Sequence, residues 1–411
     1  MKKNISAAAV ILSAAMAFTG CSENGGSLDR EIVAYIENPP EDSAENFFAI
    51  TYGAWHGEYL YRISSGGYTE ENDAELCKTY RSDIIEYLKQ EKVVLYLAEK
   101  MGITAASLTD EELEMIDDEM AESLDGWYKS FESKANAALG GSGYTEDELL
   151  EKEKKLFEEY LSDCGLTVED LTSWKVNEII RNKFISKVGE EIDDETVEDF
   201  VQKTVDTAKE TYEKDIAEYE KTYTPFYIPE GSRVVQQLVV MIDDISISEV
   251  KAYRKEGDDE KADEVLEKAL EKVKFRIDEA YEKLEQGTPW KEVQEEYNDE
   301  SSTNDQDFNL YPKSSSIEEK VIAIGMDIEE KGGYSEIIQT DSGYSIIYYK
   351  DDLVFTDEQM NSLIEQGRAF LTDQESYKRV TDFSNEYPYV MDYELLNLDD
   401  PDAEETAAAS E

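Results

Sequence analysis

Apart from carboxylates, this sequence has few side chains of the types that carry out acid–base, nucleophilic or metal chemistry. His56 is the one histidine among 411 residues, which excludes any reaction or metal site that needs two imidazoles. No G-x-S-x-G nucleophile elbow occurs, and the runs of Asp and Glu lack the spacing and central Gly of an EF-hand loop. We therefore expect no metal site and no cofactor, and we expect His56 to be a packed or surface residue.

The cysteine in the most informative context is Cys21. A short basic start at Met1–Lys3 is followed by an apolar run that is too short to span a bilayer, which is typical of a secretory signal. The residues Phe18-Thr19-Gly20-Cys21 resemble a bacterial lipobox. The resemblance implies cleavage before Cys21 and acyl chains such as palmitate at that residue, which would place a lipoprotein on the extracytoplasmic face of the cell membrane. The alternative is an ordinary cleaved signal with a chance cysteine.

Two further cysteines, Cys77 and Cys164, lie in the predicted mature chain. They could pair in an oxidising compartment, but two cysteines do not make a disulfide framework. We favour unpaired thiols at both positions.

The formal net charge of -57 restricts the partners of the chain. Nucleic acid needs Lys and Arg to neutralise its phosphates, so nucleic-acid binding is excluded, and broad adhesion to anionic lipid is disfavoured. The acidity has two interpretations, namely solubility through self-repulsion or attraction of basic clients and loosely bound cations. The first is the more common reason for such a charge.

Hydrophobic periodicity predicts an α+β chain with a helical first half. Apolar residues recur at helical spacing in Asp83–Met101 and in Thr167–Val188. Thr109 with Glu112, Thr145 with Glu148, and Thr356 with Gln359 have the spacing of capping boxes. A long polar helix is expected over Glu195–Tyr223, before Pro225.

The periodicity changes after Gly231, where Arg233–Ile242 is rich in β-branched residues and predicts a buried strand. Helices are expected over Asp259–Gln286, after Pro289 and over Ile317–Ile324, followed by an alternating aromatic strand from Gly343 to Tyr349. This order predicts a small domain with an antiparallel sheet. The expected organisation is signal peptide and lipidated Cys, 1–21; flexible spacer, 22–45; helical domain with a connecting helix, 46–228; sheet domain, 229–353; C-terminal helix and strand returning to the helical domain, 354–398; disordered acidic tail, 399–411.

Two known families resemble parts of this pattern. The block Arg233–Asp352 resembles a parvulin-type (PpiC) peptidyl-prolyl isomerase domain. The likeness is carried by Arg233–Val240, Leu284, Gly287, Trp290, Tyr297–Ser302, Tyr334–Ile337 and Thr340–Ile347. The helices from Arg81 to about Phe200 resemble the helical chaperone domain of SurA and of PrsA-type foldase lipoproteins, which have the Arg81–Ile85, Lys100–Ile103 and Gly165–Leu171 patterns.

The resemblance implies a set of site residues. In the family, two histidines on the sheet share the floor of the active-site groove. The position of the first histidine is occupied here by Gln236 or Gln237, with a one-residue ambiguity of register, and the position of the second by Ser345. Glu300 corresponds to the Cys or Asp beside the twisting bond and Ser342 to the family's serine. Ile317 and Val321 correspond to the seat of the proline ring.

The resemblance implies an extracytoplasmic, membrane-anchored foldase whose clients are unfolded or secreted polypeptides. Because both family histidines are absent, two hypotheses stand: a holding chaperone with a degenerate isomerase domain, and an active prolyl isomerase. A hypothesis from another class is a solute-binding or cell-wall interaction lipoprotein, although the alternating β-α-β repeats of solute-binding proteins are missing.

Overall fold

The computed structural model describes residues 28–222 and 226–399, which form two compact units. Unit 1 comprises 28–193 and 368–399, and unit 2 comprises 194–367 within the described ranges. Both units combine helices with a small antiparallel sheet, so the expected α+β class is confirmed. The predicted signal segment, Cys21 and residues 400–411 of the predicted tail lie outside the described residues.

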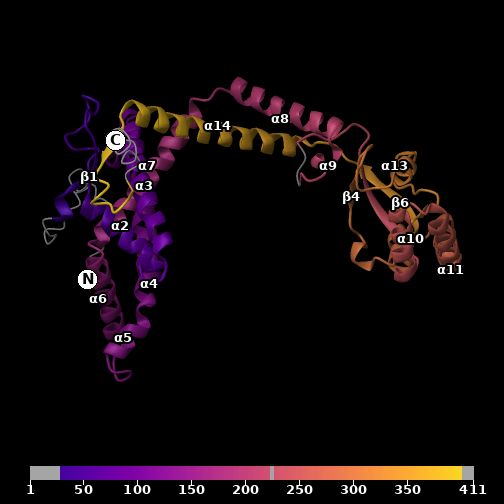
Figure 1. The fold of residues 1–411 in the computed structure, drawn as a ribbon, viewed down its shortest axis with the longest axis horizontal. Coiled ribbons are helices and arrows are strands. Elements are labelled where there is room, and N and C mark those ends of the chain that lie inside the picture. Colours follow the sequence, from indigo (N-terminus) through magenta and orange to yellow (C-terminus); the bar gives the residue numbers. More distant parts are fainter. Residues whose placement is uncertain (1–27, 223–225, 400–411) are drawn as a thin grey trace, which may run out of the picture. The chain divides into compact units, whose positions relative to one another are not determined.

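Unit 1 is mostly helical and carries a three-stranded sheet of order β2-β1-β7. In chain order its elements are η1 (Leu28–Arg30), β1 (Ile32–Ile36), β2 (Ile50–Thr51), α2 (Tyr52–Ser65), α3 (Ala74–Lys100), η2 (Ala105–Ser107), α4 (Asp110–Ser130), α5 (Glu132–Ala138), α6 (Glu146–Asp163), α7 (Val168–Glu190), the second part of α14 (Asp357–Glu386) and β7 (Tyr389–Met391). The helices α4 and α6 lie side by side, with α5 at the end of the pair (Figure 1).

The sheet of unit 1 corrects one expectation. Residues 22–45 are predicted to be a flexible spacer, but β1 lies inside this range and buries Val33 and Ala34 completely. β1 pairs with β7 from the other end of the chain, with Ala34 opposite Met391. Because a strand this short is stabilised by its partners and by burial of one face, it gives a weak signal in its own sequence.

The C-terminal helix contacts unit 1 through its second part. The Arg368 guanidinium donates a hydrogen bond of 2.8 Å to the Ile192 carbonyl at the end of α7, and Arg379 pairs with Glu191 at 2.8 Å. Cationic groups are favourable near the carbonyl end of a helix. The C-terminal end of α7 is therefore attached to the middle of α14 by these polar contacts and by packing against Thr372.

Unit 2 contains a four-stranded antiparallel sheet of order β4-β3-β6-β5. Its elements are α8 (Asp194–Lys214), α9 (Ile216–Tyr219), β3 (Arg233–Met241), α10 (Asp244–Glu256), α11 (Asp259–Glu285), α12 (Trp290–Tyr297), η3 (Ser301–Thr303), β4 (Phe308–Leu310), α13 (Glu319–Met326), β5 (Ile338–Thr340), β6 (Gly343–Asp352) and the first part of α14. Instead of one helix over Glu195–Tyr223, the chain forms α8, which ends at Lys214, and the short α9.

The two faces of the β3–β6 pair bury different partners. One face packs against α10, α11 and α12, with Leu238, Val240 and Ile346 in this core. The other face packs against α13, through Val235 and Ile347. Since side chains alternate along a strand, the neighbours Gln236 and Gln237 must project to opposite faces.

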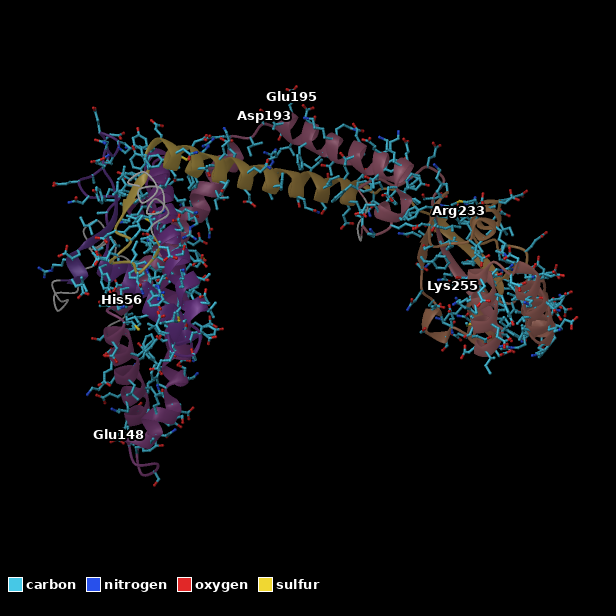
Figure 2. The ribbon with its side chains drawn as sticks, viewed as in Figure 1. His56, Glu148, Asp193, Glu195, Arg233 and Lys255 are labelled. Atoms are coloured by element: carbon cyan, nitrogen blue, oxygen red, sulfur yellow. The ribbon has the colours of Figure 1, made fainter. Side chains whose placement is uncertain are left out.

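The histidine and the two cysteines of unit 1 are packed among other side chains. His56 stacks on Tyr52 with ring centroids 4.9 Å apart, and burial lowers the pKa of its imidazole. Figure 2 shows His56 among the helices of unit 1 and Arg233 at the start of β3 in unit 2. Cys77 and Cys164 are both buried and free. None of the helices in the described ranges combines the length and the hydropathy that a bilayer crossing requires.

Candidate functional site: the β3–β6 groove

A groove of about 360 Å³ lies on the α13 side of the unit 2 sheet. We call it the β3–β6 groove, and its lining residues are Gln237, Val239, Met241, Glu300, Phe308, Ser316, Ile317, Glu318, Val321, Thr340, Ser342 and Ser345. Strand residues at every second position of β3 contribute to it, as the pleat of a strand requires. Six of the seven predicted site residues are therefore brought together: Gln237, Glu300, Ile317, Val321, Ser342 and Ser345.

The seventh predicted residue, Gln236, is not in the groove. Its side chain is buried, and Nε2 donates to Asp307 Oδ1 at 2.8 Å. The register of β3 against β6 places Gln237 opposite Ile347 and Val239 opposite Ser345. The structure thus places Gln237, and not Gln236, beside Ser345.

The floor of the groove is a neutral hydrogen-bonded pair. Gln237 Nε2 donates to Ser345 Oγ at 2.8 Å, along a diagonal between the two strands. Ser345 is completely buried. Among the hydrogen bonds of the described residues, no acceptor receives the proton of the Ser345 hydroxyl. A hydroxyl can donate once while it accepts, but Ser345 is completely buried, so a ligand oxygen would reach this proton only after neighbouring side chains move.

Ser342 lies in the turn between β5 and β6. Its Oγ is 3.2 Å from Thr340 Oγ1, and its carbonyl accepts a 3.0 Å bond from Ile242 N. The next residue, Gly343, has φ of +147°, and a Cβ there would come within 2.2 Å of the Val240 carbonyl oxygen. Only glycine allows this close approach of the turn to β3.

The loop that carries Glu300 is fixed to β3 by Asn298. Asn298 Oδ1 accepts the Val239 N–H at 2.9 Å, and Nδ2 donates to the carbonyl of Glu300 at 2.9 Å and to Asn304 Oδ1 at 2.7 Å. Asn298 is 8% exposed. Because one amide side chain bonds both the strand and the loop, it holds Glu300 at the groove.

A second attachment of the same loop is ionic. The Asp299 carboxylate accepts the Met241 N–H at 2.8 Å and bonds both terminal nitrogens of Arg276, at 2.8 and 2.7 Å. Although burial alone would raise the pKa of Asp299, the Arg276 guanidinium and the Met241 amide bring this pKa below its usual value. Asp299 therefore stays ionised and holds the loop at neutral pH.

The wall of the groove is apolar. Ile317 and Val321 come from the segment that enters α13, and Phe308 comes from β4. Val321 and Ile347 belong to one buried cluster, so the wall is backed by a packed core. A neutral polar floor beside such a wall could seat a small apolar ring and hydrogen-bond an adjoining carbonyl.

Several lining residues are missing from the sequence prediction. Val239 and Met241 follow from strand alternation once Gln237 is assigned to the groove, so this signal was present. Ser316 and Glu318 come from the bend before α13 and Thr340 from the short strand β5, and the position of both segments depends on tertiary packing. The lining contains no histidine, lysine or arginine, and the described residues contain no group of three or more side chains that could hold a metal ion.

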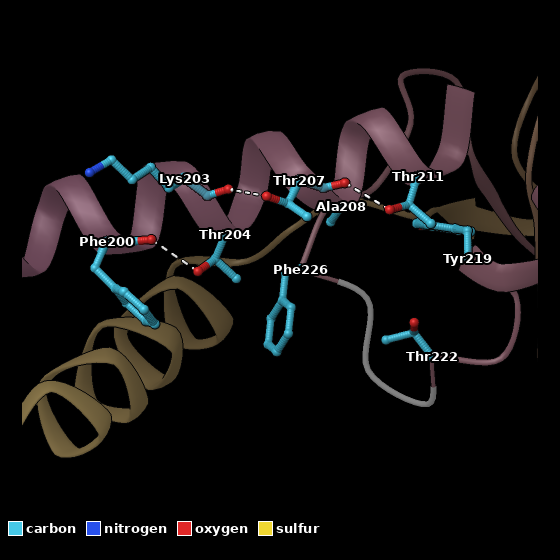
Figure 3. A pocket seen from close by; sticks show the side chains of 9 residues that line it. All are labelled: Phe200, Lys203, Thr204, Thr207, Ala208, Thr211, Tyr219, Thr222 and Phe226. Carbon is cyan, nitrogen blue, oxygen red and sulfur yellow. Dashed lines mark hydrogen bonds between the residues drawn. The ribbon is translucent and has the colours of Figure 1, made fainter. Parts of the chain in front are cut away.

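A second cavity, of about 480 Å³, lies along α8. We call it the α8 groove, and its lining residues are Phe200, Lys203, Thr204, Thr207, Ala208, Thr211, Tyr219, Thr222 and Phe226. Three threonine hydroxyls donate to carbonyls of α8 four residues earlier, at 2.8–2.9 Å: Thr204, Thr207 and Thr211 (Figure 3). Because these hydroxyls are satisfied within the helix, they offer little polar recognition to a ligand.

Comparisons with known proteins give matches among solved structures alone. No protein-family model matches the chain, and no curated protein matches it. The structure is similar to that of the foldase protein PrsA from Streptococcus pneumoniae str. Canada MDR_19A, with 12% identity, a TM-score of 0.22 and coverage of 90% of this chain and 96% of that chain.

Two further matches are of the same kind. PrsA from Bacillus subtilis is 14% identical, with a TM-score of 0.21 and coverage of 85% of this chain and 92% of that chain. A SurA-like chaperone from Campylobacter jejuni is 11% identical, with a TM-score of 0.24 and coverage of 88% and 98%. All three are foldases or SurA-like chaperones, the class named by the resemblance in the sequence, but neither the identities nor the TM-scores are high enough to assign a family.

Proposed function

We propose that this chain is an extracytoplasmic folding factor, tethered by a lipid on Cys21, that binds unfolded polypeptides and seats their prolyl segments in the β3–β6 groove. The observation that carries the proposal is the convergence of Gln237, Ser345, Glu300 and the Ile317–Val321 wall in one cavity. These residues come from four separate segments, and the resemblance to a prolyl isomerase domain names them in advance.

The chemistry of a prolyl bond makes modest demands on such a groove. Rotation about the bond between a residue and proline faces a barrier of about 18–20 kcal/mol, and no covalent bond breaks. A protein favours rotation when it binds the twisted amide better than the planar one. An apolar wall suits the proline ring, and the free proton of Ser345 suits the carbonyl oxygen of the preceding residue.

The floor also suggests that binding exceeds turnover. Where the family has two histidines, this chain has the pair Gln237 and Ser345, which bond to each other. A neutral amide and a hydroxyl form a short network with no ionisable group, so the field that they offer to the twisted amide is weaker than that of a network with imidazoles. We therefore propose a groove that holds prolyl segments and accelerates their rotation little.

Binding of longer client segments is supported by the remaining surface. The α8 groove offers apolar contacts with few unsatisfied polar groups. Exposed apolar surface that is concave and rimmed by polar residues is typical of interaction sites. A net charge of -57 keeps such a protein soluble while it carries an unfolded client.

The test uses the full chain, purified from membranes in a non-ionic detergent. Ile317→Glu places a carboxylate in the wall of the groove, and Ile245→Glu makes the same change at a residue that is 73% exposed on α10. We expect the wild type and Ile245→Glu to bind a proline-containing peptide and Ile317→Glu to lose binding. Suppression of aggregation of an unfolded secreted protein is measured in parallel.

Two outcomes would contradict the proposal. Equal binding of the peptide by both variants would remove the groove as the prolyl site. If the wild-type protein has no effect on the aggregation of the unfolded secreted protein, the proposed role as a folding factor is wrong. A protease-coupled assay measures turnover, and a rate well above that of heat-denatured protein would make the chain an active isomerase. Mass spectrometry of the membrane-bound protein tests the lipid on Cys21.

A further inference from the structure

We propose that the β3–β6 groove selects prolyl segments that carry a lysine or arginine next to the proline. This inference rests on the proposed function and adds the chemical class of the client sequence. It follows from the charges that line the groove, from the way in which one of them is held, and from the shape of the remaining lining.

The charged side chains of the groove are of one sign. Glu300 and Glu318 are its two ionisable lining residues, and no lysine or arginine is among the lining. Glu318 Oε2 lies 3.2 Å from Lys320 Nζ, so this carboxylate has a cation of its own. Within residues 28–222 and 226–399, the Glu300 carboxylate has no ion-pair partner and receives no side-chain hydrogen bond.

Glu300 is held in place although its charge is unpaired. Its backbone carbonyl accepts two hydrogen bonds, one from Asn298 Nδ2 at 2.9 Å and one from the Thr303 hydroxyl at 2.8 Å. The preceding residue, Asp299, is fixed to Arg276. A carboxylate on an anchored backbone loses less conformational freedom when it forms an ion pair than one on a mobile loop does.

The apolar wall defines where the cation of a client would lie. A proline ring against Ile317 and Val321 leaves the adjoining residues of the segment along the rim, where Glu300 is exposed. A long lysine or arginine side chain can cover apolar surface with its methylenes and still bring its charge to a carboxylate. The same position disfavours a client Asp or Glu, because two like charges at the rim repel each other.

The expected selectivity is modest because the rim is wet. Exposed ion pairs contribute about 0.2–1 kcal/mol, which corresponds to a preference of at most about fivefold at 25 °C. The whole chain, with 97 acidic and 40 basic residues, also attracts any cationic peptide. A local effect of Glu300 must therefore be separated from this general attraction.

The experiment compares twin peptides on the full chain in non-ionic detergent. One twin has lysine before the proline and the other has Nε-acetyl-lysine, which keeps the length of the side chain and removes its charge. A second pair places the same residues after the proline. Affinity is measured by fluorescence anisotropy in low salt and again in high salt, on the wild type, Glu300→Gln, Glu318→Gln and Glu249→Gln. Glu249 is an exposed residue of α10 outside the groove lining, so its variant loses the same net charge.

We expect the lysine twin of at least one pair to bind about two- to fivefold tighter than its acetylated twin, less so in high salt. The preference disappears in Glu300→Gln, persists in Glu249→Gln and falls less in Glu318→Gln. Equal binding of the twins by the wild type overturns the inference and leaves prolyl binding intact. A preference that survives in Glu300→Gln also overturns it. If replacing the proline by alanine leaves the affinity unchanged, the proposed prolyl site itself fails.

Discussion

Replacement of Asn298 by alanine should loosen the edge of β3 and the Glu300 loop together. The variant removes the acceptor of the Val239 N–H and the donor to the Glu300 carbonyl, both at 2.9 Å. Val239 is 7% exposed, so its amide would be left largely without water. A buried unsatisfied amide costs about 1–3 kcal/mol, and each lost bond at the loop adds about 0.5–1.5 kcal/mol where water does not replace it.

These contributions give an expected loss of about 2–4 kcal/mol for local opening of β3. Hydrogen exchange followed by mass spectrometry measures this directly, since a loss of 2 kcal/mol speeds exchange by about 30-fold when opening is rapid and reversible. Asn309→Ala is the matched control, because Asn309 is exposed on β4 and its amide bonds Tyr311 at 3.3 Å. Asn298→Ala should also weaken binding of the prolyl peptide. Unchanged exchange of residues 233–241 in Asn298→Ala would refute the reasoning that this residue joins the strand to the loop.

Two further predictions concern unit 1. Burial lowers the pKa of Lys92 from 10.5 to about 8, so the unfolded state binds more protons between these values and the free energy of unfolding should rise with pH from about 8 towards 10. Urea midpoints followed by circular dichroism should show this rise in the wild type and a flatter profile in Lys92→Met, and identical profiles would contradict it. Thr109 accepts the Glu112 N–H at 3.2 Å in a capping box of α4. Thr109→Ala should cost about 1 kcal/mol in the same assay, and a cost near zero would show that this cap does not limit the stability of unit 1.

Features that depend on a few neighbouring residues could be predicted from the sequence. The capping boxes at Thr109 and Thr145 are both confirmed, because each needs a hydroxyl and a carboxylate three residues apart. The pair Thr356 and Gln359 forms the same bonds at the start of α14. The strands β3 and β6 were also predicted, since each is long and rich in β-branched or aromatic residues.

Features that depend on distant partners could not be predicted. A C-terminal strand was expected within 354–398, but its partner β1 was not, because the pairing of β7 with β1 joins segments more than 350 positions apart. The short strands β4 and β5 likewise exist because β3 and β6 offer them free edges. The helix α10 was missed because its sequence, Asp244–Glu256, buries Ile247 and Val250 but exposes Ile245, which obscures the apolar face.

The ambiguity between Gln236 and Gln237 shows that the local sequence pattern does not determine the register of β3, which depends on packing instead. A shift of one residue moves every side chain of a strand to the other face. The flanking residues of β3 are apolar on both faces, since one face packs against α10–α12 and the other against α13, so alternation of polarity could not choose a register. The choice is made by the pairing of β3 with β6, which brings Val239 opposite Ser345 and therefore Gln237 onto the side of the groove.

The partner of Gln236, Asp307, then explains why a second glutamine is tolerated next to the first. The buried Gln236 amide is hydrogen-bonded to Asp307 at 2.8 Å and has no need of a ligand. Gln237 instead lines the groove and bonds Ser345, so it is the one of the two that we propose meets a bound peptide.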